Sequence, residues 1–190
     1  GSWLSYGLGS ENKNLPAFCV LLSKGKGNGQ GVYSKLWSNG FLDSIHQGVQ
    51  FSSGENPVLY LNDPEGMDKT DRRRMLDKLA ELNEENYKDF GDPEINTKIQ
   101  QYEMAYRMQS SVPELTDFSK ESKETLELYG IRQPGDGSFA SNCLLARRLA
   151  ERGVRFIQLY HRAWDHHSDI ERNMPIAAKE CDQASAALLQ

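Results

Sequence analysis

Residues 138–160 read SFASNCLLARRLAERGVRFIQLY, and this stretch decides the fold class of the chain. Its first part carries an apolar stripe at helical spacing, formed by Phe139, Cys143, Ala146 and Leu149. The spacing predicts a helix that ends at Gly153, because glycine readily takes the left-handed conformation that follows many helices. The apolar residues 154–160 then predict a buried strand. A helix that feeds a strand across one glycine is half of a β-α-β crossover, so we expect an α/β fold with parallel strands.

The seven residues directly after this strand read HRAWDHH and contain three of the four histidines of the chain. Ligands of open α/β sheets collect beyond the carboxyl ends of the strands. Imidazole and carboxylate groups are ligands of zinc and similar divalent metals. If the chain continues extended, its side chains alternate, so His161, Asp165 and His167 share one side, whereas Trp164 and His166 face the other. We expect Asp165 and His167 to be the metal-binding pair.

An ordinary surface loop is the alternative interpretation of this cluster. Histidine and aspartate are both common on protein surfaces, so an Asp-x-His pattern alone has little specificity. If Asp165 and His167 share a metal, a carboxylate oxygen and an imidazole nitrogen should approach within roughly 3 to 4 Å, in a concavity beyond Tyr160. Opposite orientations of the two side chains, or the lack of a strand over residues 154–160, would contradict the metal assignment.

Composition limits the classes of protein that this chain can belong to. Its 190 residues, 38% of them hydrophobic, suffice for one domain with a core. The net charge of −5 argues against a nucleic-acid-binding surface, which needs a basic patch. No apolar run approaches the roughly 18 residues that a membrane span requires, and no signal peptide is visible. Cys19, Cys143 and Cys181 form no C-x-x-C motif, so they predict buried or free thiols rather than disulfides or a structural zinc site.

The region before residue 68 predicts short strands and loops. Residues 16–22 are an apolar run that predicts a buried strand, and residues 57–61 predict another short one. Between them, glycine occupies positions 25, 27, 29 and 31. This spacing lacks the Gly-Lys-Ser/Thr ending of a phosphate-binding loop, so a flexible loop is the favoured interpretation. His46 stands alone and is interpreted as structural or solvated.

Residues 68–90 predict the first of two long helices in the middle of the chain. Leucines repeat along it at helical spacing and form an apolar stripe, Leu76, Leu79 and Leu82. The charged run DRRR at residues 71–74 is interpreted as the solvated face of its first turns. An anion-binding role for these arginines is the less favoured alternative.

A second long helix is predicted to begin after Asp92. Asp92 supplies an N-cap acceptor, Pro93 suits the first helical position, and Glu94 complements the helix dipole. Pro113 predicts the end of this helix. An apolar stripe along it, which we interpret as core or as an interface to a partner, consists of Ile95, Ile99, Tyr102 and Tyr106. A short helix is then predicted within residues 119–129.

Many segments of the chain match one protein family in the same order. These segments read GSWLSYGLGSEN (1–12), LP (15–16), GFL (40–42), QGVQF (47–51), QYEMAYRMQ (101–109), SVPEL (111–115), LELYG (126–130), CLLARRL (143–149), ERGVRF (151–156) and HRxWDxH (161–167). Together they resemble the "domain of unknown function 1501" family of sulfatase-like proteins. The resemblance covers essentially all 190 residues and is far more specific than any single motif.

The resemblance implies membership of the alkaline phosphatase and sulfatase superfamily, whose fold is a large mixed sheet sandwiched by helix layers. On this basis, residues 1–190 are expected to be the central part of a single alkaline-phosphatase-like domain, with residues 68–129 as a helical insertion. The chain opens without methionine and closes on a helix-like run without a stop signal. We therefore expect a fragment whose N- and C-terminal parts are missing.

The resemblance also implies a chemistry. Enzymes of the superfamily hydrolyse phosphate or sulfate esters by nucleophilic attack, with one or two metal ions. Asp165 and His167 match the family's W-D-x-H element, and His161 is a candidate third ligand or support for one. His166 occupies the variable position of that element. The expected cofactor is a divalent metal, namely zinc, calcium or manganese, and the expected partner is a small-molecule or glycan sulfate or phosphate ester.

Parts of the superfamily chemistry are not found in this sequence. The nucleophile is not identifiable here, and the family's glycine-glycine-glutamate-phenylalanine-glycine-arginine element is absent. We therefore expect the 190-residue chain alone to be inactive, while the parent protein is exported or periplasmic by resemblance. The alternative function is a binding or surface-associated protein that kept the sulfatase-like fold but lost catalysis. The oligomeric state is left open.

Overall fold

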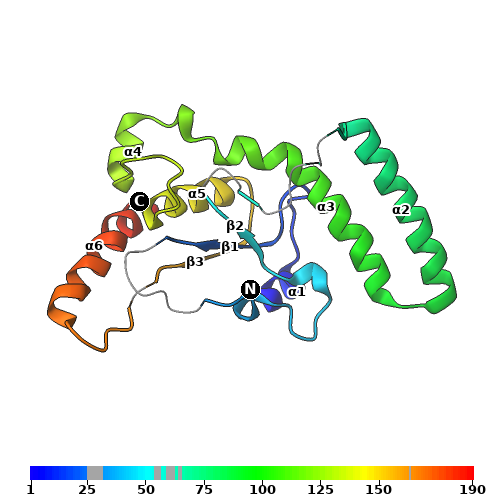
Figure 1. The fold of residues 1–190 in the computed structure, drawn as a ribbon, viewed down its shortest axis with the longest axis horizontal. Coiled ribbons are helices and arrows are strands. Elements are labelled where there is room, and N and C mark those ends of the chain that lie inside the picture. The colour runs from blue at the N-terminus through cyan, green and yellow to red at the C-terminus, as the bar shows by residue number, and fades with distance from the viewer. Residues whose placement is uncertain (25–31, 54–56, 59–62, 64–65, 163) are drawn as a thin grey trace.

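A parallel β-sheet forms the centre of the computed structural model (Figure 1). The structure describes residues 1–24, 32–53, 57–58, 63, 66–162 and 164–190. The sheet has three strands in the order β2-β1-β3, which are β1 (Phe18–Leu22), β2 (Val49–Phe51) and β3 (Phe156–Tyr160). Cys19 in the middle strand lies opposite Val49 on one side and Ile157 on the other. The α/β fold with parallel strands is confirmed, as is the buried strand predicted within residues 16–22. The strand predicted within residues 154–160 also forms, but its residues are half-buried rather than buried.

The two faces of the sheet are covered by different kinds of structure. Cys19 and Leu21 of β1 join the main hydrophobic core on the helical side. Phe18 and Val20 point the other way and pack with Trp37, the last residue of the 3-10 helix η1 (Ser34–Trp37). This alternation with period two is expected of a strand that is buried on both faces.

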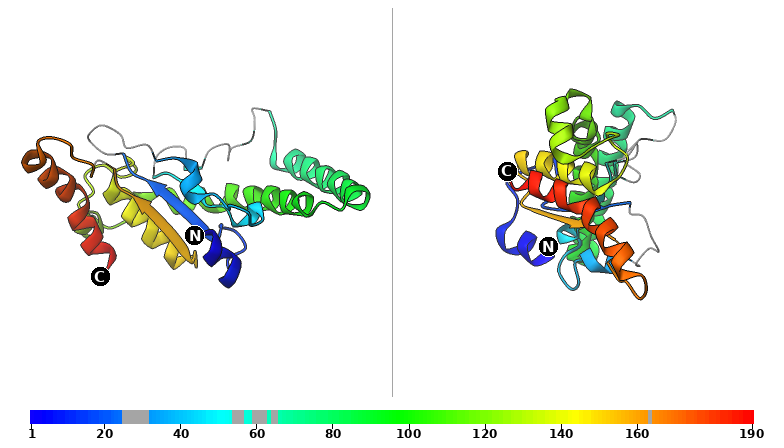
Figure 2. Two further views of the ribbon diagram at one scale, coloured as in Figure 1. Left: turned by 90° about the horizontal axis from the view of Figure 1, so that it is seen from below. Right: turned by 90° about the vertical axis from the view of Figure 1, so that its left-hand side faces the viewer.

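Helices cover the main core. They are α3 (Pro93–Thr116), α4 (Lys123–Tyr129), α5 (Phe139–Glu151) and α6 (Ile170–Leu188). Helix α5 lies at their centre, and eight of its 13 residues are buried. Figure 2 shows α5 running along the sheet, with α6 beside it and crossing towards the end of β3. The remaining short elements are α1 (Ser2–Leu8), η2 (Ser44–His46) and η3 (Phe118–Lys120).

The junction between α5 and β3 forms as its sequence predicts. The Ser138 hydroxyl accepts a hydrogen bond from the Ser141 amide and caps the start of α5. At the other end, Gly153 has a φ of 82°. Its amide donates to the carbonyl of Ala150 at 2.9 Å, and the Val154 amide donates to that of Leu149 at 3.1 Å. This pair of bonds is a Schellman motif, which ends the helix and turns the chain directly into the strand.

Helices α2 (Lys69–Phe90) and α3 form a hairpin that extends from the body of the molecule (Figures 1 and 2). Both begin where the sequence predicts, because the side chains of Asp68 and Asp92 accept backbone hydrogen bonds of the first turns. Only Leu76 of α2 is buried. Leu82, predicted to share the apolar stripe, is exposed, because the outer face of α2 has no covering element in the part of the chain that the structure describes.

The arginine run in α2 is only partly the solvated face that its pattern indicates. The guanidinium of Arg73 forms two hydrogen bonds with the carboxylate of Glu103 on α3, at 2.5 and 3.1 Å. Arg73 also lies over the Tyr106 ring, and Arg72 pairs with Asp63 at 3.4 Å. Arg74 alone remains largely exposed. The correction is that two of the three arginines form ion pairs: Arg73 connects α2 to α3, and Arg72 binds Asp63 in the segment before α2.

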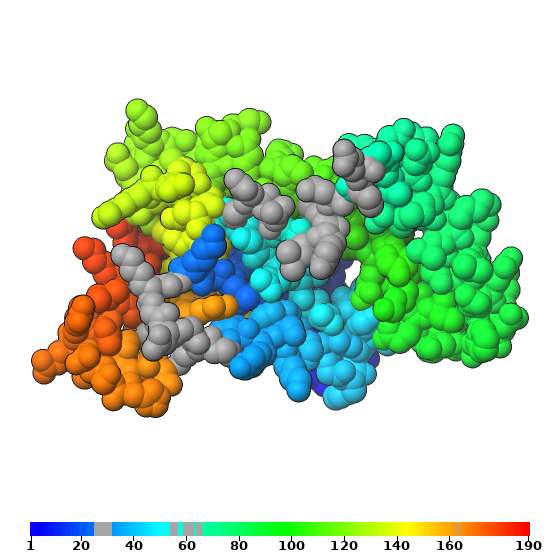
Figure 3. Space-filling view, viewed as in Figure 1, coloured from blue at the N-terminus to red at the C-terminus, as the bar shows by residue number. Residues whose placement is uncertain are grey.

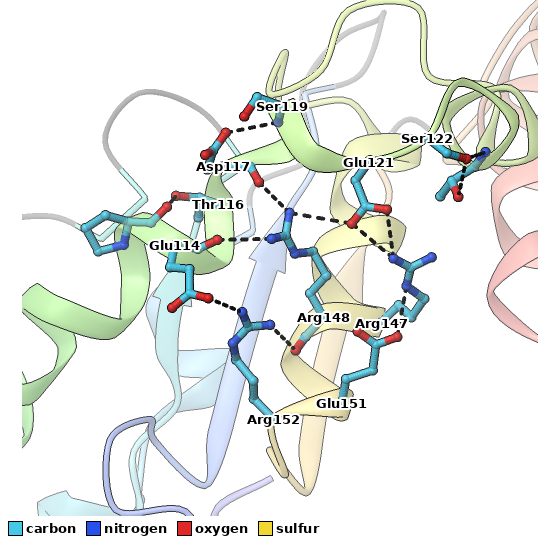
Figure 4. Close-up of polar contacts among 12 residues, drawn as sticks. Glu114, Thr116, Asp117, Ser119, Glu121, Ser122, Arg147, Arg148, Glu151 and Arg152 are labelled. Carbon is cyan, nitrogen blue, oxygen red and sulfur yellow. Dashed lines mark hydrogen bonds and ion pairs between the residues drawn. The ribbon is translucent and has the colours of Figure 1, made fainter.

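The prediction that Pro113 ends the second helix is wrong. Helix α3 continues through Pro113 to Thr116 and buries Val112 and Leu115 completely. A proline inside a helix costs about 3 kcal/mol, so tertiary interactions must offset that cost. The buried guanidinium of Arg148 on α5 supplies some of them, because it donates to the carbonyls of Glu114 at 3.0 Å and Asp117 at 2.7 Å (Figure 4).

Several smaller predictions can also be compared with the structure. All three cysteines are free thiols, and Cys19 and Cys143 are buried. His46 has a structural role, because its Nδ1 lies 3.0 Å from the Ser5 hydroxyl of α1. No described helix is long and apolar enough to cross a membrane. The glycine-rich loop at residues 25–31 and most of the strand predicted at 57–61 lie outside the described residues.

Candidate metal centre

The predicted cluster lies at the edge of the sheet where the three parallel strands end. The amide of Ser23 donates to the carbonyl of Tyr160 at 3.1 Å, so β1 and β3 stay paired up to this edge. Beyond Tyr160 the described residues form no further strand, and the chain reaches α6 at Ile170. The cluster therefore occupies the position where open α/β sheets commonly bind ligands.

Asp165 and His167 lie next to each other on this segment. The Nε2 atom of His167 is 2.9 Å from Oδ2 of Asp165, which satisfies the expected approach of the two groups. Their side chains are 87% exposed for His167 and 55% exposed for Asp165. The expected concavity around the pair is therefore not found among the described residues. The Asp165 carboxylate and the His167 imidazole are both exposed to solvent.

His161 does not share a side with this pair, which corrects the expected alternation. Its side chain is only 7% exposed and packs edge-on against the Phe139 ring of α5 at 5.2 Å. Its Nδ1 accepts a hydrogen bond from the Trp164 indole at 2.8 Å, and its Nε2 lies 3.2 Å from Oε2 of Glu180 on α6. The extended backbone ends at Tyr160, so burial between α5 and α6 rather than strand period sets the direction of the imidazole.

The geometry of Asp165 and His167 suits part of a metal site. Two ligand atoms about 2.0–2.2 Å from a tetrahedral ion lie about 3.3–3.6 Å apart, so the observed separation needs only a small adjustment. However, the described residues hold no group of three His, Cys, Asp or Glu side chains that could bind an ion together. The pair therefore fits as two ligands of a site that needs further ligands. The metal-binding role of Asp165, His167 and His161 stays a prediction.

Sequence reasoning missed a set of buried polar groups at the same edge of the sheet. The side-chain amide of Asn142, on α5, donates to the Ser23 hydroxyl at 3.1 Å. The Asn142 carbonyl oxygen and the Ser53 hydroxyl are buried without a hydrogen-bond partner among the described residues. Burial alone would raise the pKa of the neighbouring Asp136, but hydrogen bonds from Ser138 and Ser141 hold it below its ordinary value. No spacing rule marks Asn142, because only the packing of α5 on β1 brings it to Ser23.

A cavity of about 790 Å³ lies at the opposite edge of the sheet, where the strands begin. Residues before β1 and at the start of β2 line it together with one side of α3, including Leu15, Val49, Lys98, Met104 and Arg107. None of the cluster residues 161–167 borders this cavity. This cavity is therefore separate from the predicted metal ligands.

Comparison with known proteins identifies the family of the chain and no closer relationship. The family model described as "Protein of unknown function (DUF1501)" matches residues 1–190. The chain belongs to this family. No curated protein and no solved structure matches the sequence.

Proposed function

We propose that the protein containing this DUF1501 chain is a metal-dependent hydrolase of phosphate or sulfate esters. The observation that carries the proposal is the Asp165 and His167 pair, 2.9 Å apart and beyond the carboxyl end of β3. The position and the chemical types of the two groups favour a divalent ion over an ordinary surface loop. Many reactions depend on a divalent metal. We propose ester hydrolysis among them because the sequence resembles sulfatase-like proteins.

Each group of the cluster has a distinct part in this proposal. Asp165 and His167 are two ligands of the ion, and a complete site needs further ligands and a nucleophile besides this pair. A bound divalent ion would activate the nucleophile and neutralise charge on the transferred group. His161 is the candidate for a third ligand or for the support of one, and in the structure one of its ring nitrogens accepts from Trp164 while the other faces Glu180. It fixes the start of the segment against α6.

The test uses the full-length gene product and the variant Asp165→Asn/His167→Ala. Hydrolysis of aryl phosphate and aryl sulfate esters is measured with added zinc, calcium or manganese and after chelation. We expect turnover that depends on the metal and is lost in the double variant. Asp169→Asn is the matched control, because Asp169 is an exposed carboxylate near the pair whose side chain caps nothing, and its left-handed backbone suits asparagine.

Two outcomes decide between this proposal and its alternative. If no ester is turned over with any of these metals, the hydrolase proposal fails, and the second candidate, a sulfatase-like protein without catalysis, takes its place. The second candidate is favoured by one observation, namely that the pair is exposed and no third ligand group joins it in the described residues. We also expect no turnover by the 190-residue chain alone, since two ligands are fewer than the three protein ligands usual in catalytic zinc sites.

A further inference from the structure

The cavity at the edge where the strands begin has walls that hydrogen bonds hold in place. Its volume of about 790 Å³ lies within the range of 300–1,000 Å³ that is usual for small-molecule sites. On the wall before β1, the side-chain oxygen of Asn12 accepts a hydrogen bond from the Leu15 amide at 2.9 Å. Between η2 and α3, the Ser44 hydroxyl accepts from Gln101 at 2.8 Å and donates to Glu94 at 3.0 Å. Figure 3 shows α3 (green) beside the segment that contains η2 (cyan), so the cavity is already formed without a ligand.

The apolar side chains that border this cavity are aliphatic. Val49 of β2 and Met104 of α3 are half-buried there, and Met108 lies buried one helical turn further along α3. Ile45 of η2 is 41% exposed at the border. Among the described residues that line the cavity there is no Phe, Tyr or Trp, so a planar ligand finds no aromatic ring to stack on. A lining of branched aliphatic residues and adaptable methionines suits an alkyl chain.

Positive charge gathers at one corner of this cavity. The Arg107 guanidinium donates a hydrogen bond to the carbonyl of Lys13 at 3.0 Å, so the two basic residues are neighbours there. Both border the cavity, as does Lys98, nine residues or about 14 Å before Arg107 along α3. Among the described lining residues, Glu103 is the one Asp or Glu. The lining is therefore basic, although the chain as a whole carries a net charge of −5.

The carboxylates near this corner are engaged by other arginines. Glu103 attracts Arg107 through space, but its carboxylate receives two hydrogen bonds from Arg73 of α2. Glu11 pairs with Arg155 at 3.0 Å. In the described part of the chain, neither basic residue of the corner has a carboxylate within ion-pair distance. An anionic ligand at this corner would therefore meet two cations without having to break an existing ion pair.

We propose that this cavity binds a medium-chain fatty carboxylate, with its alkyl chain along α3 and its carboxylate at Lys13 and Arg107. The guanidinium uses one nitrogen for the Lys13 carbonyl, which leaves further N–H donors for the ligand. The aliphatic lining takes up the alkyl chain, which removes apolar surface from water. The inference does not depend on the proposed metal site, because none of the residues 161–167 borders the cavity.

Isothermal titration of the full-length protein with octanoate, decanoate and dodecanoate tests the proposal. A chelator is present throughout, so that no carboxylate binds through a metal ion. Affinity should rise about threefold to fourfold for each added methylene, because each buried methylene leaves water. Decyltrimethylammonium carries the same alkyl chain on a positive head group, and we expect it to bind at least about tenfold more weakly than decanoate.

Charge reversal locates the carboxylate. Lys13→Glu/Arg107→Glu should weaken decanoate binding at least about tenfold and should strengthen the binding of decyltrimethylammonium, because the corner then attracts a cation. Lys120→Glu/Arg132→Glu is the matched control. It changes the net charge equally, at exposed positions that do not border the cavity, and should leave both affinities unchanged. Circular dichroism of each variant reports whether the fold is retained.

Two results would overturn the proposal. One is a wild-type protein that binds none of the three carboxylates up to about 1 mM. The other is decanoate binding that the Lys13→Glu/Arg107→Glu variant retains in full, which would point to another surface, such as the exposed aromatic residues Trp3, Tyr6 and Phe41. Because no metal takes part in the titration, failure here leaves the hydrolase proposal untouched, and the reverse holds as well.

Discussion

Replacing Arg148 by methionine should destabilise the chain strongly, although Arg148 is far from the candidate metal ligands. Its guanidinium is 90% buried and donates to the carbonyls of Glu114 and Asp117, just after the proline that α3 accommodates. It also lies 3.6 Å from the carboxylate of Glu121 (Figure 4). The guanidinium lies over the Phe118 ring as well. Methionine keeps much of the side-chain volume but leaves these acceptors without their donor.

The magnitude follows from the number and burial of these contacts. Each hydrogen bond to a charged donor contributes about 1.5–3 kcal/mol, partly offset because burying the guanidinium is itself costly. We therefore expect Arg148→Met to lower the free energy of unfolding by about 3 kcal/mol, or the Tm by about 6–12 °C for a chain of this size. The neighbouring Arg147 binds the same Glu121 at 3.0 Å but is about a third exposed. Arg147→Met should cost only about 1 kcal/mol.

Urea denaturation followed by circular dichroism measures both variants under identical conditions. A larger loss for Arg148→Met than for Arg147→Met is the expected result. Equal losses in the two variants, or a loss below about 1 kcal/mol for Arg148→Met, would refute the argument that Arg148 holds the end of α3. In that case the continuation of α3 through Pro113 would rest on the apolar burial of Val112 and Leu115 alone.

Three further predictions concern single groups. Gly153→Ala should destabilise the chain by about 1 kcal/mol in the same assay, because the φ of 82° is strained for alanine. Because burial raises the pKa of Cys143 to about 12, a thiol reagent at pH 8 should label the partly exposed Cys181 first, and equal labelling rates would contradict this. The hydrogen bond from Arg73 lowers the pKa of Glu103 below its ordinary 4.5, although burial opposes the shift. The ionised Glu103 carboxylate therefore stabilises the fold above pH 4.5, and this contribution is lost as the pH falls and the carboxylate is protonated. In the Glu103→Gln variant, the free energy of unfolding should decrease less between pH 7 and acidic pH than in the wild type.

The parts of the fold that were predictable from sequence are those encoded by neighbouring residues. Ser138, Gly153 and the apolar run after it specify the α5–β3 junction within about 23 positions. The caps at Asp68 and Asp92 likewise depend on residues two or three positions away. Local hydrogen bonds of this kind need no knowledge of the tertiary structure, and the elements that they define were predicted correctly.

The incorrect predictions depend on residues that are distant in sequence. Pro113 stays within α3 because Arg148, 35 positions later, binds the following carbonyls. His161 turns away from Asp165 because α6 brings Glu180 to it, and no spacing rule links the two residues. The close approach of Asp165 and His167 was predictable, since two positions separate them and their chemistry is attractive. Whether they bind a metal depends on further ligand groups, which the described residues do not bring to this pair.

The metal affinity of the full-length protein tests the central claim most directly. Isothermal titration with zinc, calcium and manganese compares the wild type with the Asp165→Asn/His167→Ala and Asp169→Asn variants. The account predicts that the double variant loses at least about a hundredfold in affinity for the preferred ion, because two ligands are removed, while Asp169→Asn binds like the wild type. An affinity that is unchanged in the double variant would contradict the assignment of Asp165 and His167 as metal ligands.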